Sequence, residues 1–325
     1  MNMSFFSHNR ATGFSLVELM IAMLLGLLII GGVISVFLSN RVAYRQNENL
    51  ARMQENARYA FEIVGRDIRE SGGILCGANL TPANTLTNPS ANWWSSWNDG
   101  TNNINGMRGF EGKQVNAAFP KAFGTAAASR VEGADDDTTP DALIVQSATS
   151  QSFVITGHDP VGDQEFTLNT DEHEITVGDV LMACDYGKAA LFSVTVVDDA
   201  EISHSNTVLQ TSTFQPGGQL TQLSANAWYI GFNGRGGRSL YRVPMVGAAE
   251  EVAEDVTDLQ IQYLVKDANG NLPTSYIDAD SVTNWSRVIA LRVVFTLQSS
   301  ESIGTDSQPI IRTWNTVISL RNRQP

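Results

Sequence analysis

Residues 13–38 of the chain read GFSLVELMIAMLLGLLIIGGVISVFL. From Leu19 to Leu38 this stretch carries no charged residue, and about 20 apolar residues in a helix suffice to cross the hydrocarbon core of a bilayer. A buried helix of a globular domain is rarely apolar on every face, and the apolar part of a cleaved secretory signal is usually only about 7–15 residues long. We therefore expect a retained, membrane-spanning helix.

A single charged residue, Glu18, lies just inside the apolar run. A carboxylate at the centre of a helix in hydrocarbon costs about 2–3 kcal/mol or more, and less near the helix end, so such residues usually have a partner or a function. The alternative is that Glu18 only marks the edge of the span and reaches interfacial water. The preceding residues, RATGFSLV at 10–17, favour a function, because they form a short basic leader followed by Gly13 and Phe14.

Residues 13–18 match the type IV prepilin signature G-F-[ST]-L-[VI]-E at every position. In that family a membrane peptidase cuts after the glycine and methylates the new N-terminal phenylalanine. The resemblance therefore implies a leader at 1–13, cleavage after Gly13 and an N-methylated mature terminus at Phe14. It also implies that Glu18 pairs with the terminal amine of a neighbouring subunit, where two charges that are each costly in lipid offset one another.

The orientation of the span is a point of tension. The leader offers Arg10, whereas Arg41, Arg45 and Arg52 follow the span, so a count of positive charges alone would place the C-terminus in the cytoplasm. The peptidase signature implies the opposite orientation: a single pass through the inner membrane at 14–38, with the remainder in the periplasm and later in a surface pilus.

A second, amphipathic helical segment is expected at 39–72. Between 40 and 71 the only helix-breaking residue is Gly65. Apolar residues recur there at spacings of three and four, which predicts one buried stripe: Leu50, Met53, Ala57, Ala60, Val64 and Ile68. One continuous helix from Phe14 to Ser71 would be about 87 Å long. Gly31 and Gly32 would either let it bend or allow close helix packing.

Residues 73–325 are expected to form a β-rich, mainly antiparallel head, which makes the fold class α+β. Residues 78–107 are rich in Asn, Thr, Ser and Gly and predict a long surface loop. Its Trp93, Trp94 and Trp97 would either form a contact patch for another subunit or fold back onto the head. Asn233-Gly234 predicts a hairpin. Strands are expected, from their β-branched runs between turn residues, at 142–146, 180–184, 190–197, 227–232, 239–243, 259–265, 288–297 and 310–320.

Several blocks in the helix and head together resemble the PilW-type minor pilin family. They are ENARYAFEIVGRDIRESGG, GDVLMACD with AALFSVTVV, SLYR, VTDLQIQYLVKDANG and TVISLRNR. The resemblance implies a scarce subunit that primes pilus assembly and lies at or near the tip. It also implies as partners other minor pilins, the major pilin, the prepilin peptidase, the inner-membrane assembly platform and a tip adhesin. A minor pseudopilin of a type II secretion system shares the N-terminus and is the alternative, although its head is usually smaller.

The two cysteines, Cys76 and Cys184, form no CxxC motif and have no histidines around them, so zinc is not expected. In an exported head we expect them to form a disulfide. Cys184 falls in a block where the family often carries a cysteine, and the pairing with Cys76 is our own inference.

The remaining residues indicate a structural protein without cofactor or metal. A net charge of −13, from 21 basic and 34 acidic residues, argues against a nucleic-acid partner. The four histidines are isolated in the sequence, and no hydrolase, metalloprotease or nucleotide-binding motif is present. Asp135-Asp136-Asp137 predicts a solvated loop, with a Ca²⁺ site as its alternative. A membrane-tethered periplasmic enzyme is the rival class.

Overall fold

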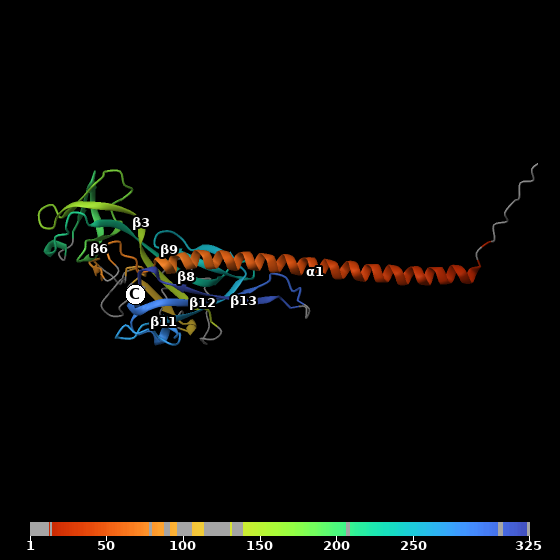
Figure 1. The fold of residues 1–325 in the computed structure, drawn as a ribbon. Helices are drawn as coiled ribbons and strands as arrows, with labels where there is room; N and C mark the ends of the chain where they lie inside the picture. The colour runs from red at the N-terminus through yellow and green to blue at the C-terminus, as the bar shows by residue number, and fades with distance from the viewer. Residues whose placement is uncertain are drawn as a thin grey trace, which may run out of the picture.

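The structure is a computed structural model that describes residues 13, 15–77, 80–87, 92–95, 106–113, 131, 139–205, 209–304 and 308–323. Within these ranges one long helix, α1, carries a β-rich head on its C-terminal half, and its N-terminal half projects freely (Figure 1). All strand pairs except one short parallel pair are antiparallel in the described parts of the chain. The predicted α+β class is confirmed.

Helix α1 spans Leu16–Glu70 and passes through Gly31 and Gly32 as one uninterrupted α-helix (Figure 1). It ends because Gly72 adopts a φ of +69°, a conformation that glycine reaches without steric cost. Two hydrogen bonds then fix the end of the helix to the head: the Gly72 amide donates to the Gln146 carbonyl (2.9 Å), and the Ser71 hydroxyl donates to the Gly106 carbonyl (2.7 Å).

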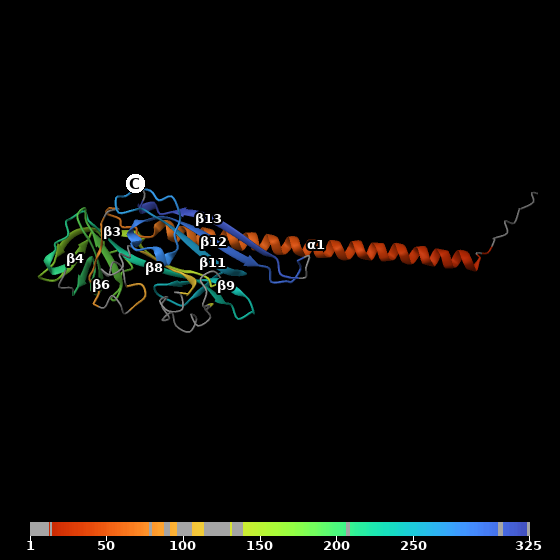
Figure 2. The same ribbon diagram turned by 90° about the horizontal axis from the view of Figure 1, so that it is seen from below.

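Six strands form a closed ring at the end of the head farthest from the free half of α1 (Figures 1 and 2). Around the ring, β3 pairs with β8, β8 with β5, β5 with β6, β6 with β7, β7 with β4, and β4 with β3. We call this the distal barrel. Its strands are β3 (Ala142–Asp159), β4 (Glu165–Leu168), β5 (Val180–Cys184), β6 (Ala189–Asp198), β7 (Glu201–His204) and β8 (Gln219–Phe232). Its core is aromatic, with Phe153, Phe166, Phe192 and Phe214 buried.

The half of the head beside α1 contains two sheets. The first half of β3 and the second half of β8 continue out of the barrel. There β3 pairs with β2 (Met107–Phe110), β8 pairs with β9 (Arg238–Pro244), and β9 pairs with β10 (Glu250–Glu254). The separate sheet has the order β11 (Val256–Val265), β12 (Val288–Gln298) and β13 (Ile311–Ser319). One hydrophobic core joins α1 to both sheets and includes Met53, Val64, Ile68, Trp228, Ile261, Leu291 and Phe295.

The remaining described elements are short. Strand β1 (Ala83–Asn84) lies in the predicted loop and pairs in parallel with β6. The 3₁₀ helices are η2 (Leu209–Thr211), η3 (Ala279–Ser281), η4 (Trp285–Arg287) and η5 (Arg321–Arg323). The hairpin predicted at Asn233-Gly234 joins β8 to β9. Its loop has five residues, closed by Phe232 opposite Arg238 and by the side chain of Asn233, which accepts the Arg235 and Gly237 amides.

Candidate assembly site

The start of α1 brings two signature residues into a reciprocal contact. Ser15 has an extended backbone and caps the helix, with its hydroxyl accepting the Glu18 amide (3.2 Å) while Oε2 of Glu18 accepts the Ser15 amide (3.0 Å). This capping box satisfies two amides that the first turn of a helix leaves without partners. Gly13 is exposed, and no atom lies within 4 Å of the position that a side chain would take there. Phe14 and residues 1–12 lie outside the described residues.

The apolar half of α1 has no packing partner within the described chain. Its large apolar side chains are at least half exposed from Leu16 to Leu38. The helix is long and apolar enough to cross a membrane, and its most apolar window of 18 residues contains no buried residue. A surface of this size is stable only in lipid or against other apolar helices.

The second half of α1 is embedded in the head through the predicted stripe. Met53, Ala57, Ala60, Val64 and Ile68 are all buried. Leu50 is only half-buried. The same face also buries Gly65 and two polar residues that were not singled out from the sequence, Asn49 and Asp67.

Asp67 is a polar anchor between α1 and strand β8. Its Oδ2 accepts hydrogen bonds from Nε1 of Trp228 (3.1 Å) and Nδ2 of Asn226 (2.9 Å), and Trp228 is fully buried. Burial raises the pKa of the Asp67 carboxyl, and these two donors oppose the rise. The only sign of this anchor in the sequence is that an acidic residue falls on the apolar stripe, three positions after Val64.

A second contact holds the head to α1 closer to the apolar half. Arg45 forms an ion pair with Glu301 (2.9 Å), and the Gln46 amide group donates to the Ile303 carbonyl. Glu301 and Ile303 lie between β12 and β13, in the part of the head nearest the free helix (Figure 2). The head therefore begins about seven residues, or about 10 Å, beyond Leu38.

Two family models match the chain, one in its N-terminal part and one in its C-terminal part. Residues 8–34 match the prokaryotic N-terminal methylation motif, and residues 227–321 match Type IV Pilus-assembly protein W. The C-terminal part of the head is therefore similar to the PilW family. No curated protein matches the chain. The resemblance drawn from the sequence is confirmed.

The PilW match connects the chain to the type IV pilus and, through the methylation motif, to prepilins. The apolar helix and the prepilin signature indicate membrane anchoring and association with a pilus. A pilus-assembly family implies contacts with other pilus components, and the PilW family is a structural family rather than a known family of enzymes.

A disulfide in the head links the segment after α1 to the distal barrel. Cys76 lies six residues beyond Glu70, and it is bonded to Cys184 at the end of β5. Cys184 is fully buried, in a cluster with Ile74, Met182 and Leu191.

The tryptophans of the 78–107 segment are partly described. Trp93 packs against the cluster around Phe110 and Tyr229, and Trp94 packs against the cluster around Cys184. Trp93 and Trp94 therefore fold back onto the head, which was one of the two alternatives expected for them. Trp97 lies outside the described residues, as do Asp135, Asp136 and Asp137.

The structure brings together two histidines that are 46 residues apart in the sequence. Nε2 of His158 lies 3.1 Å from Nε2 of His204, and Nδ1 of His158 accepts the Phe214 amide (3.1 Å). Nδ1 of His158 is therefore unprotonated, so its Nε2 carries the hydrogen and donates to His204. Burial lowers the pKa of both imidazoles to about 4, with His204 and Lys188 adding to the effect on His158. No group of three or more potential metal ligands occurs in the part of the chain that the structure describes.

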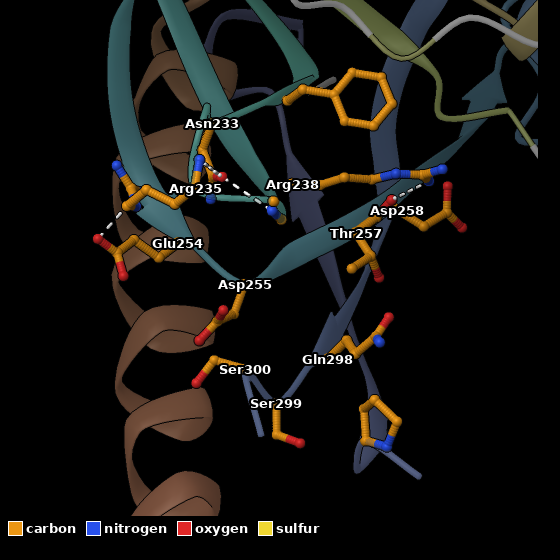
Figure 3. A pocket seen from close by; sticks show the side chains of 14 residues that line it. Asn233, Arg235, Arg238, Glu254, Asp255, Thr257, Asp258, Gln298, Ser299 and Ser300 are labelled. Atoms are coloured by element: carbon orange, nitrogen blue, oxygen red, sulfur yellow. Dashed lines mark hydrogen bonds and ion pairs between the residues drawn. The ribbon is translucent and has the colours of Figure 1, made fainter. Parts of the chain in front are cut away.

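A polar groove of about 700 Å³ lies beside α1, between the β8–β9 loop, the β10–β11 turn and the end of β12 (Figure 3). Two of its lining residues are arginines: Arg235 pairs with Glu251 and Glu254, and Arg238 donates to the Thr257 carbonyl (3.1 Å). Its lining residues include neither histidine nor cysteine. The groove therefore offers no pair of a nucleophile and an imidazole base.

Proposed function

We propose that the chain is a minor pilin that primes type IV pilus assembly at the inner membrane and lies at or near the pilus tip. The observation that carries this proposal is the division of α1. One half is packed under the head, and the other, which begins with the prepilin signature, presents exposed side chains that are almost all apolar. A subunit divided in this way can leave lipid for a bundle of similar helices without any change in its head.

The proposed assembly step uses the residues at the start of α1. Cleavage after Gly13 would free the amine of Phe14, which is then methylated. The Glu18 carboxylate, which caps its own helix through one oxygen, would pair with the amine of a neighbouring subunit. Pairing of residue 18 with a neighbour's residue 14 offsets the two helices by four residues, or about 6 Å along the axis. The pair thereby sets the axial register.

The head, which we propose to lie in the periplasm before assembly, would decide which subunits can be neighbours. It acts by surface contacts and not by catalysis. We propose as partners other minor pilins, the major pilin, the prepilin peptidase, the assembly platform and a tip adhesin. The second candidate is a minor pseudopilin of a type II secretion system. The large head of residues 73–325 favours the pilus.

Deletion of the gene separates the two candidates. A pilus primer predicts loss of surface pili with type II secretion intact, and complementation by the wild-type gene restores the pili. Loss of secretion with normal pili would identify a pseudopilin instead. Normal pili and normal secretion would refute both.

Processing is tested with Gly13→Val. Because a branched side chain replaces the glycine before the cut, we expect an uncleaved precursor in the membrane with lower mobility on a gel. Val17→Ile, which keeps the signature, serves as the control. Unchanged mobility of the Gly13 variant would refute the cleavage site.

A further inference from the structure

Four arginines from three elements line one hollow of about 680 Å³ where α1 ends. Arg66 and Arg69 come from the last turns of α1, Arg242 from β9 and Arg321 from η5. We call this hollow the arginine pocket. It lies where β3 and β8 pass from the sheet beside α1 into the distal barrel, because its wall also includes Ala148, Thr149 and Ser224.

The arginines are not neutralised by the acidic residues that share the pocket. Asp67 is already bound by Trp228 and Asn226 and lies 3.9 Å from Arg66, while Glu70 is the second acidic lining residue. Arg242 pairs with Glu250 outside the pocket. Neither Arg69 nor Arg321 has an ion pair with any residue that the structure describes. Four arginines against Asp67, Glu70 and the Glu250 that pairs with Arg242 leave a local charge of +1.

This basic pocket contrasts with the rest of the head. Residues 150–218, which include most of the distal barrel, contain eleven acidic residues and one basic residue, Lys188, for a net charge of −10. The whole chain has a net charge of −13. An anionic partner is therefore repelled by the barrel and attracted to the pocket, which gives the approach a direction.

The lining selects among anions. Guanidinium groups present planar pairs of N–H donors that match carboxylates and phosphates. Beside them the wall is apolar at Ile74, Leu75 and Pro244, and Leu75 remains about half exposed (47%). A ligand with both carboxylates and apolar side chains fits this combination better than an inorganic anion does.

The position of the pocket excludes the headgroups of the membrane that α1 would span. From Leu38, the end of the apolar run, to Glu70 there are 32 residues of helix, or about 48 Å. With α1 upright, this distance is several times the thickness of a headgroup layer. A neighbouring protein can reach the pocket.

We propose that the arginine pocket receives an acidic, partly apolar segment of a neighbouring pilin. This inference rests on the proposed function for the presence of neighbouring pilins, and it adds where one of them contacts the head. Arg69 and Arg321, which form no ion pair with the described residues, make the principal contacts with its carboxylates.

The test is photocrosslinking in piliated cells from a photoreactive residue placed at Leu75. We expect an adduct with another pilin, identified by mass spectrometry, whose crosslinked peptide contains Asp or Glu. The double variant R69E/R321E should reduce this adduct about tenfold or more, since two attractive contacts become repulsive. The double variant R58E/R312E is the matched control, because it reverses one exposed arginine of α1 and one of β13 outside the pocket.

A binding measurement on the full chain in detergent covers the case in which charge reversal disturbs folding. The probes are the acidic peptide ELEEL, its neutral counterpart QLQQL and inorganic phosphate. We expect ELEEL to bind, QLQQL to bind at least about tenfold more weakly, and the neutral variant R69Q/R321Q to lose this preference while keeping the wild-type unfolding temperature.

Three outcomes would overturn the proposal: no pilin adduct at Leu75, an adduct equally strong in R69E/R321E and R58E/R312E, or phosphate binding as tightly as ELEEL. Each can be told from failure of the proposed function, which is read separately from the deletion. Pili lost on deletion but unaffected by the pocket variants would refute the pocket alone.

Discussion

Replacing Asp67 tests whether a buried carboxylate fastens α1 to the head. In Asp67→Ala the indole N–H of Trp228 loses its acceptor at a fully buried position, and the amide group of Asn226 loses its acceptor at a half-buried one. An unsatisfied buried donor costs about 1–3 kcal/mol. Relief of the unfavourable burial of the carboxylate, which raises its pKa, offsets part of that cost. We expect a net loss of about 2–4 kcal/mol in the free energy of unfolding.

The assay is urea unfolding of the full chain in detergent micelles, followed by tryptophan fluorescence, because Trp228 itself changes environment. Asp67→Asn keeps an oxygen acceptor and should lose about 1 kcal/mol or less. Glu62→Ala, on the exposed face of the same helix, should stay within about 0.5 kcal/mol of wild type. If Asp67→Ala unfolds at the same urea concentration as Glu62→Ala, the anchor contributes nothing and the reasoning is wrong.

Three further predictions concern other contacts. Replacing both Cys76 and Cys184 with serine removes a covalent link between residues 108 apart and should lower the free energy of unfolding by up to about 4–5 kcal/mol. The same urea unfolding assay, without reductant, measures this loss, and an unchanged midpoint would contradict the prediction. The pKa values of His158 and His204 are lowered from 6.5 to about 4, so the unfolded chain binds protons first on acidification. Stability from this pair should be constant above about pH 6.5, fall towards pH 4 and level off below, and His158→Phe should flatten the profile in thermal melts; an identical profile would count against the pair. Ser15→Ala removes a helix cap worth about 1 kcal/mol and should speed amide exchange of the first turn of α1 several-fold in micelles, whereas Ser15→Thr should not.

The helix and the strongest strands were predictable because their patterns are local. The apolar run and the stripe from Met53 to Ile68 predict α1 nearly to its ends. The β-branched runs predict β5 at its observed bounds and β12 to within one residue. The stripe of α1 and the alternation of β12 follow simple periods, whereas β5 is a short apolar run that is buried at every position. Each of these patterns is visible in a single segment without knowledge of its neighbours.

The distal barrel was not predictable in this way. Strands β4 and β7 have only four residues each, EFTL and EISH, and begin with a charge. They are held by ring closure with partners far along the chain rather than by their own propensity. Strands β3 and β8 were predicted too short because their polar middle, around Ser147 and Ser224, resembles a turn. In the structure each strand continues there from the sheet beside α1 into the barrel.

The residues of the site likewise divide into those that a local sequence pattern identifies and those that depend on distant partners. Gly13, Phe14 and Glu18 lie within six consecutive residues, so a motif can identify them as candidates. Their roles in processing and register remain predictions. The Ser15–Glu18 capping box could also be predicted from the sequence, because serine followed three residues later by glutamate is its pattern. The Asp67 anchor and the histidine pair depend on partners 159, 161 and 46 residues away, which no local pattern reveals.

The disulfide has a mechanical consequence. Six residue steps separate Glu70 from Cys76 and extend to about 22 Å at most. The disulfide adds 5.8 Å between the Cα atoms of Cys76 and Cys184, so the covalent path from the end of α1 to β5 cannot extend beyond about 27 Å. A force applied to the distal barrel reaches α1 through the disulfide and residues 71–76. It does not have to pass through residues 107–142 or the sheets beside α1. Shear that breaks the noncovalent packing of the head would therefore leave the distal barrel attached to α1 by a short covalent connection.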